Sequence, residues 1–294
     1  MAMKQSEIDA LNESIEALDR SKVKFKGLTY GESGVGKTIL NLDLAQRITP
    51  PDKRILYVDT GEGWVSALNH PQLKKRVQRM VYKGMKQFSV LVQAIQEDVP
   101  GFDDYGSIIF DEFSTSAKKF LHVVLDANQV DRMKEAPEFK HWGIMSRNIE
   151  STVWDLLKLK ETHHLFFIAH ERVRENKRTK IEITRPAFMD SIEGTVKNDM
   201  HVVARMTASV SNATGAPQYV RDLQCHPTKM VIAKSRIGGL DIKVSPSKFT
   251  QRIVEWMDSG ELVDEQEVVE LAEEQTVTGD FSDQSDFTGF ESED

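Results

Sequence analysis

The chain has 294 residues, an apolar fraction of 39% and a net charge of −8 at pH 7. This length suits one large domain with appendages or two small ones, and the apolar fraction is ample for a buried core. No run of eighteen apolar residues is present and the polar N-terminus has no secretory or transit pattern, so we expect no membrane association and a cytoplasmic location. Cys225 is the single cysteine, which excludes an internal disulfide and a cysteine-based zinc site.

The charge is divided unevenly along the chain. From Asp258 to the C-terminus there are fourteen Asp and Glu residues and no Lys or Arg, which leaves +6 on residues 1–257. A basic body favours a polyanionic partner. An acidic block of this kind is typical of segments that are disordered or used for interactions, and residues 275–294 have no core-forming pattern.

Residues 4–20 have the apolar spacing of one helical stripe, formed by Ile8, Leu11, Ile15 and Leu18. Two interpretations stay open for this helix. It packs on its own domain, or it is an arm that docks on a neighbouring protomer.

Residues 31–38 read GESGVGKT and fit the phosphate-binding pattern G-x-x-x-x-G-K-[ST]. Glycines let the backbone curl so that its N–H groups point at phosphates, Lys37 reaches the terminal phosphates, and the Thr38 hydroxyl binds Mg²⁺. The residues that we expect to bind the phosphates are Gly31, Glu32, Ser33, Gly34, Val35, Gly36, Lys37 and Thr38.

The flanking segments distinguish this loop from an accidental Gly-rich turn. Residues 25–30 favour a strand, and residues 39–48 have helical apolar spacing that ends at Pro50. The loop is therefore expected to present phosphates to a helix N-terminus, where the dipole and free N–H groups favour anions.

Two acidic positions follow predicted strands. Residues 54–60 form a buried-type strand, and Glu62 after it is a candidate general base, with a solvated loop acid as the alternative. Residues 105–113 (YGSIIFDEF) have the Walker B pattern, so Asp111 is expected to position Mg²⁺ together with Thr38, and Glu112 is expected to polarise an attacking water.

Two basic segments and one histidine complete the candidates. The basic run 74–86 is interpreted as a solvated face.

Residues 116–134 and 138–160 are expected to be core-facing helices. The strand predicted over 165–170 ends at His170, which is either a γ-phosphate sensor or a satisfied strand-end histidine. The stretch 171–180 is expected to contact nucleic acid, with a solvated hairpin as the alternative. Its basic residues are Arg172, Arg174, Lys177, Arg178 and Lys180.

Strands are also predicted over 201–207 and 229–233, and Lys234 and Arg236 follow the second of these. With these pieces in order, the chain resembles the RecA-like branch of P-loop ATPases over residues 23–257. Within that branch it is similar to short phage nucleotide-binding proteins that act in single-strand annealing or recombination. The segments that carry the resemblance are GESGVGKT, ILYVDTGEG, IIFDE, LFFIAHE and VIAKSR.

The resemblance implies an α/β fold with a mostly parallel sheet flanked by helices, and ATP and Mg²⁺ as cofactors. It implies that Glu62 is the catalytic base and that His170 relays nucleotide state. It also implies that Lys234 and Arg236 reach the ATP of a neighbouring protomer in a ring or filament. The spacing departs from the family pattern at Asp59-Thr60-Gly61-Glu62, so the base stays open between Glu62 and Glu112, with Glu62 preferred.

The expected organisation is an N-terminal helix or arm (1–22), an ATPase core (23–257) and an acidic tail (258–294). The expected function is a DNA-stimulated ATPase that binds single-stranded DNA for annealing or recombination, in the host cytoplasm if phage-encoded. The tail is expected either to recruit a replication or single-strand-binding protein or to compete with DNA for the basic loops. The alternatives are a helicase or packaging motor and a nucleotide-gated scaffold without turnover, and GTP is not excluded.

Overall fold

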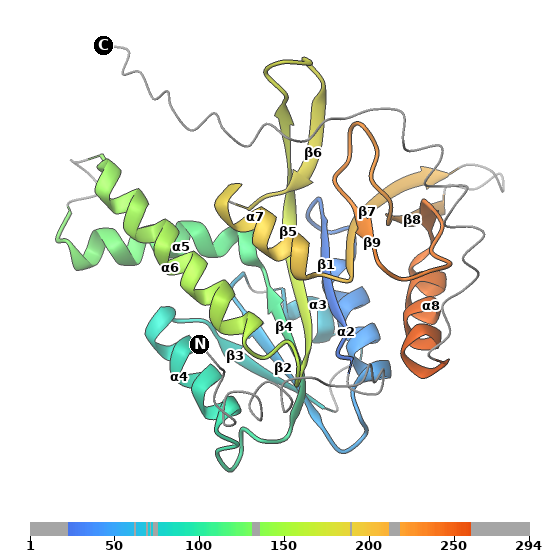
Figure 1. The fold of residues 1–294 in the computed structure, drawn as a ribbon, viewed down its shortest axis with the longest axis horizontal. Helices are drawn as coiled ribbons and strands as arrows, with labels where there is room; N and C mark the ends of the chain where they lie inside the picture. The colour runs from blue at the N-terminus through green and yellow to red at the C-terminus, as the bar shows by residue number, and fades with distance from the viewer. Residues whose placement is uncertain are drawn as a thin grey trace, which may run out of the picture. The chain divides into compact units, whose positions relative to one another are not determined.

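A mostly parallel β-sheet forms the centre of the fold (Figure 1). The computed structural model describes residues 23–259 except 62, 69, 71, 73–75, 131–135, 189 and 212–217. These residues belong to one compact unit that ends at Gly260. The predicted arm (1–22) and nearly all of the predicted tail lie outside the described residues.

The order of the strands across the sheet is β10-β8-β7-β1-β5-β4-β2-β3, with β6 paired to β5 and β9 paired to β7. The six strands from β7 to β3 in this order are parallel, and β6, β8, β9 and β10 each run antiparallel to their partner. Ligands of such sheets bind at the carboxyl edge of the parallel strands. The strands are β1 (Lys26–Gly31), β2 (Arg54–Asp59), β3 (Val77–Val81), β4 (Tyr105–Asp111), β5 (His164–Glu175), β6 (Glu182–Pro186), β7 (Val202–Ser211), β8 (Gln218–Gln224), β9 (Lys234–Ser235) and β10 (Lys243–Val244).

Helices cover both faces of the sheet and bury two apolar clusters. On one face, residues of α4, α5, α6 and α7 pack with Phe110 and Phe167. On the other face, α2 and α8 pack with Ile109 and Phe166. Neighbouring residues of β4 and β5 thus point to opposite cores, as the two-residue period of a strand requires. The helices are α2 (Lys37–Ile48), α3 (Val65–Leu68), α4 (Met85–Gln96), α5 (Phe113–Ala127), α6 (Phe139–Leu157), α7 (Asp190–Asp199) and α8 (Pro246–Ser259).

The predicted α/β class and mostly parallel sheet are confirmed, and so are the strand before residues 31–38 and the helix after them. The strand predicted over 229–233 is wrong. Thr228 and Val231 close a tight turn by donating their N–H groups to each other's carbonyl oxygen, and the strand pairing begins only at Lys234. The apolar run Met230–Ala233 is explained by the burial of Val231 and Ala233.

The stretch 171–180 continues β5 out of the sheet. Glu171–Glu175 pairs with Glu182–Pro186 in an antiparallel hairpin, which projects away from the helices in Figure 1. The Asn176 side chain accepts hydrogen bonds from the N–H groups of Arg178 (3.0 Å) and Thr179 (3.1 Å) and closes the turn. We call residues 171–186 the β5–β6 hairpin.

Candidate active site

The loop between β1 and α2 has the curled form that the sequence predicts. Gly36 has φ 106° and begins α2 without a side-chain cap, so the N–H groups of the first helical turn face the loop without a side-chain acceptor. At Gly31 a Cβ would lie 2.1 Å from the carbonyl oxygen of Met206, which only glycine avoids. The free N–H groups at this helix end form a site for anions.

The Lys37 side chain folds back over the loop. Its Nζ donates to the carbonyl oxygens of Gly31 (3.0 Å) and Glu32 (2.6 Å), and the residue is only 7% exposed. Burial lowers the pKa of Lys37, while the nearby carboxylates of Glu112 and Asp111 oppose that shift. A lysine ammonium binds charged phosphate oxygens more strongly than neutral carbonyl oxygens, so phosphates can replace these two contacts of Lys37.

Thr38 and Asp111, 73 residues apart, meet beside the loop. Thr38 Oγ1 donates to Asp111 Oδ2 at 2.7 Å, and the Tyr57 hydroxyl donates to the same oxygen. Burial raises the pKa of Asp111, and these two hydrogen bonds act in the opposite direction. Tyr57 was not predicted, although the two-residue period of β2 places it on the same face as Asp59.

The Thr38 hydroxyl and the Asp111 carboxylate fit a magnesium ion, because Mg²⁺ prefers one or two protein oxygen ligands plus phosphate oxygens and water. When bound, such an ion neutralises charge on the terminal phosphates. Among the residues that the structure describes, no group of three or more His, Cys, Asp and Glu side chains forms a metal cluster.

Glu112 contacts His170 at the same edge of the sheet. The Glu112 carboxylate contacts His170 Nε2, and His170 lies opposite Gly31 in the pairing of β1 with β5. Thr60 Oγ1 accepts from the Glu112 N–H at 2.8 Å and so fixes the backbone. The structure therefore brings Glu112 and His170 together beside the phosphate loop.

Glu62, the preferred base of the sequence analysis, lies outside the described residues. Its neighbour Gly61 is beside Glu112, since a Cβ on Gly61 would lie 3.3 Å from Glu112 Oε2. Both acidic positions therefore stay candidates for the base.

Part of the basic run 74–86 is structural. The Arg79 guanidinium donates twice to Asp59 Oδ2 (2.8 and 2.5 Å) and lies 4.3 Å from the Trp64 ring centroid. Arg76 donates to carbonyl oxygens at the end of α2, among them that of Gln46. The interpretation as a solvated face is wrong for Arg76 and Arg79, because carbonyl oxygens at the end of α2 bind Arg76 and the buried Asp59 carboxylate binds Arg79.

A protein-family model described as an AAA domain matches residues 24–237. The chain belongs to the AAA domain family. It is a P-loop ATPase of the AAA type, and the matched segment contains the phosphate loop, Asp111, Glu112 and His170. No curated protein matches the chain. None of the helices that the structure describes is sufficiently long and apolar to span a membrane.

The basic residues of the β5–β6 hairpin in this AAA ATPase occupy two environments. Arg172 lies at the base, 4.0 Å from the buried carboxylate of Glu193, which Arg185 binds at 2.7 Å. Arg174, Lys177, Arg178 and Lys180 are exposed towards the tip, and Lys180 pairs with Glu175 at 3.0 Å. The tip thus presents positive charge to solvent, while Arg172 belongs to the contact between hairpin and α7.

Lys234 and Arg236 lie at the edge of the sheet opposite the phosphate loop. Lys234 Nζ donates to the carbonyl oxygens of Lys197 (2.8 Å) and Asn198 (3.0 Å), and Arg236 donates to that of Asn198 (2.8 Å). Burial, with Arg236 nearby, lowers the pKa of Lys234 to about 8. Within one protomer they stabilise the end of α7, and their role towards a neighbour stays a prediction.

Two arginines beside the loop were not predicted. Arg205 on β7 forms two hydrogen bonds with Glu171 (2.8 and 3.0 Å), and Arg221 Nε on β8 donates to the carbonyl oxygen of Val35 at 2.9 Å. No motif marks either residue, because both reach the site through strand pairing on the far side of β1.

Proposed function

We propose that this AAA ATPase hydrolyses ATP with Mg²⁺, binds single-stranded DNA through the β5–β6 hairpin, and couples the two in annealing or recombination. The observation that carries this proposal is the course of β5. The same strand bears His170 in contact with Glu112 and, from the next residue on, forms the hairpin with its exposed basic tip.

The hydrolysis step is supported by the groups at the carboxyl edge of the sheet. Lys37 binds the terminal phosphates, Thr38 and Asp111 hold the metal, and Glu112 or Glu62 orients the attacking water. The protein has little covalent chemistry to do in phosphoryl transfer. Its main contribution is therefore to stabilise the charge of the transition state with positioned groups of this kind.

The DNA-binding step is supported by charge. Arg174, Lys177 and Arg178 are exposed at the hairpin tip, and residues 1–257 carry a net +6. Contacts with a phosphate backbone supply most of the affinity of proteins that bind single strands. A shift of His170 on nucleotide binding changes the position of the hairpin that continues from it.

We further propose a homo-oligomer, a ring or filament, in which Arg236 of one protomer acts on the ATP bound by the next. Its present contact is with a backbone carbonyl oxygen, an interaction that a phosphate replaces at little cost. The acidic tail is proposed to bind a replication or single-strand-binding protein.

The test is ATP turnover with and without single-stranded DNA, using wild type, Lys37→Ala, Arg236→Ala and a mixture of the two variants. We expect DNA to stimulate the wild type, both variants to be inactive alone, and the mixture to regain activity where an intact loop meets an intact arginine. ATP binding without turnover under every condition would favour the scaffold, and an inactive mixture would contradict the shared site.

A further inference from the structure

The contacts of the phosphate loop indicate on which side of the loop each end of the bound nucleotide lies. Lys37 and Thr38 mark the terminal phosphates, and their carboxylate partners Asp111 and Glu112 lie on the β4 side of the loop. The α-phosphate and the nucleoside must therefore leave on the opposite side, towards β7 and β8. That side holds a feature that the proposed hydrolysis site does not use.

A cavity of about 780 Å³ lies there, between α2 and α8. It begins at Gly36 in the phosphate loop and is lined by Ile39 of α2, Met206 of β7 and Val254 of α8. Its volume falls within the range of roughly 300–1,000 Å³ that is usual for small-molecule sites. Apolar atoms make up the larger share of its surface, and the charged side chains of Asp43, Arg47 and Glu255 line it as well.

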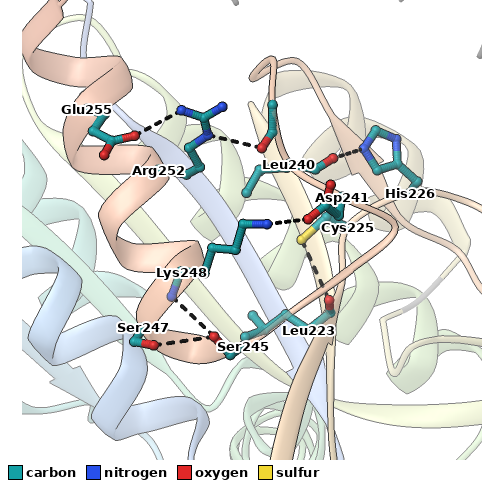
Figure 2. Close-up of polar contacts among 11 residues, drawn as sticks. Leu223, Cys225, His226, Leu240, Asp241, Ser245, Ser247, Lys248, Arg252 and Glu255 are labelled. Atoms are coloured by element: carbon teal, nitrogen blue, oxygen red, sulfur yellow. Dashed lines mark hydrogen bonds and ion pairs between the residues drawn. The ribbon is translucent and has the colours of Figure 1, made fainter. Parts of the chain in front are cut away.

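The α8 wall lies outside residues 24–237, the segment that the AAA domain model matches. It is nevertheless firmly attached. Phe249 and Ile253 are buried in the sheet core, and Arg252 Nε donates to the carbonyl oxygen of Gly239 at 3.1 Å. Figure 2 shows this contact together with the Lys248–Asp241 and Arg252–Glu255 ion pairs along one side of the helix.

Arg221 joins the cavity to the phosphate loop. It lines the cavity, its Nε donates to the Val35 carbonyl oxygen, and its guanidinium carbon lies 5.4 Å from the Tyr219 ring centroid. A planar guanidinium at this point suits contact with a base or ribose, and it also fixes the loop.

We propose that the nucleoside of the bound triphosphate occupies the α2–α8 cavity, with the base against Ile39, Met206 and Val254 and with Arg221 as the positioning residue. This inference rests on the proposed ATP-binding function. It assigns to α8, a part of this chain beyond the family segment, the wall that holds the base. Apolar surface with a small number of polar groups that fix orientation is the usual arrangement for such a ligand.

The first test separates nucleoside from phosphate binding by calorimetry with MgATP and with magnesium tripolyphosphate, which has no nucleoside. Val254→Trp places a bulky ring in the cavity beside α2, and Asp258→Trp adds the same ring at an exposed position of the same helix. We expect Val254→Trp to weaken MgATP binding about tenfold or more and to leave tripolyphosphate binding within about twofold, with no change for Asp258→Trp. Unchanged MgATP binding, or an equal loss for both ligands, would overturn the proposal.

The second test needs no variant. Full-length protein is labelled with 8-azido-ATP, whose reactive group is on the base, and the labelled peptides are mapped. We expect label in the peptides that contain α8 or the first turn of α2, and competition by ATP. Label confined to other segments would refute the assignment. Neither test depends on turnover or DNA. If only the DNA-coupled function is wrong, both tests still give the expected binding and labelling; if this site is wrong, they do not.

Discussion

At the scale of single residues, the Asp111 carboxylate illustrates how the site is prepared for an ion. It is 3% exposed, and two hydroxyl groups donate to one of its oxygens. Burial of a carboxylate costs free energy unless hydrogen bonds or a cation compensate it. Tyr57 and Thr38 supply that compensation while keeping the carboxylate oriented towards the phosphate loop.

The choice between the two candidate bases is decided by Glu112→Gln and Glu62→Gln. Replacing the true base removes proton transfer from the attacking water, so we expect single-turnover hydrolysis to fall about 10²–10⁴-fold with ATP affinity unchanged. The other variant should stay within about tenfold of wild type. Because Glu112→Gln also disturbs the contact with His170, His170→Gln is the matched control. If neither glutamine variant slows hydrolysis, neither glutamate is the base.

At the scale of secondary-structure elements, the β5–β6 hairpin is fixed at its base and charged at its tip. Glu193 of α7 is buried and binds Arg185, with Arg172 nearby, so the base of the hairpin is joined to the helix. A buried carboxylate without a partner is costly, which excludes Arg172 and Arg185 as clean tests of DNA contact. Arg174 and Arg178 towards the tip are exposed.

We therefore expect Arg174→Ala combined with Arg178→Ala to weaken single-stranded DNA binding and to leave thermal stability unchanged. The logarithm of the DNA association constant falls linearly with the logarithm of the salt concentration. Each lost phosphate contact should make this slope shallower by about 0.7. Fluorescence anisotropy over a salt series measures this slope. The control is Lys140→Ala with Arg147→Ala, exposed positions on α6. An equal loss in both double variants would point to general electrostatics rather than to the hairpin.

The elements differ in how far the sequence predicts them. The phosphate loop and its flanking strand and helix follow from spacing, since each position has a separate chemical requirement. Thr38 and Asp111 were both expected at Mg²⁺ from the phosphate-loop and Walker B patterns, and a direct contact between them was not predicted. Arg79 was misinterpreted, since its partner Asp59 is twenty residues away and local charge spacing contains no sign of it. Arg221 and α8 were not predicted because no motif marks them: strand pairing brings Arg221 to the loop, and α8 lies beside it by packing on α2.

At the scale of the whole molecule, the edge of the sheet opposite the phosphate loop contains neutral histidines that are buried (His163 and His164) or half-buried (His201). His164 Nδ1 accepts from the Phe25 N–H at 2.9 Å, and His201 Nδ1 accepts from the Lys26 N–H at 3.3 Å. Burial lowers the pKa of His164 to about 3 and those of His163 and His201 to about 4. Protonation would place a charge in the core and remove an acceptor from the first strand.

These lowered pKa values fix the sign of a pH effect. Between pH 6.5 and about 4 the unfolded chain binds protons that the folded chain does not, so the free energy of unfolding falls as the pH falls. Each histidine contributes about 1.4 kcal/mol per pH unit. Urea unfolding at several pH values measures the slope of the unfolding free energy against pH. This slope should be smaller for His201→Asn, which retains an acceptor, than for the wild type. A wild-type slope in His201→Asn would contradict this account.

The length of β5 has a mechanical consequence for the molecule. A strand rises about 3.3 Å per residue, so the five steps from His170 to Glu175 cover about 17 Å without an intervening loop. Over that distance a rotation of about 5° where β5 leaves the sheet displaces Glu175 by about 1.5 Å. A small rotation of β5 at His170 would therefore be amplified along the strand into a displacement large enough to make or break contacts at the tip of the hairpin.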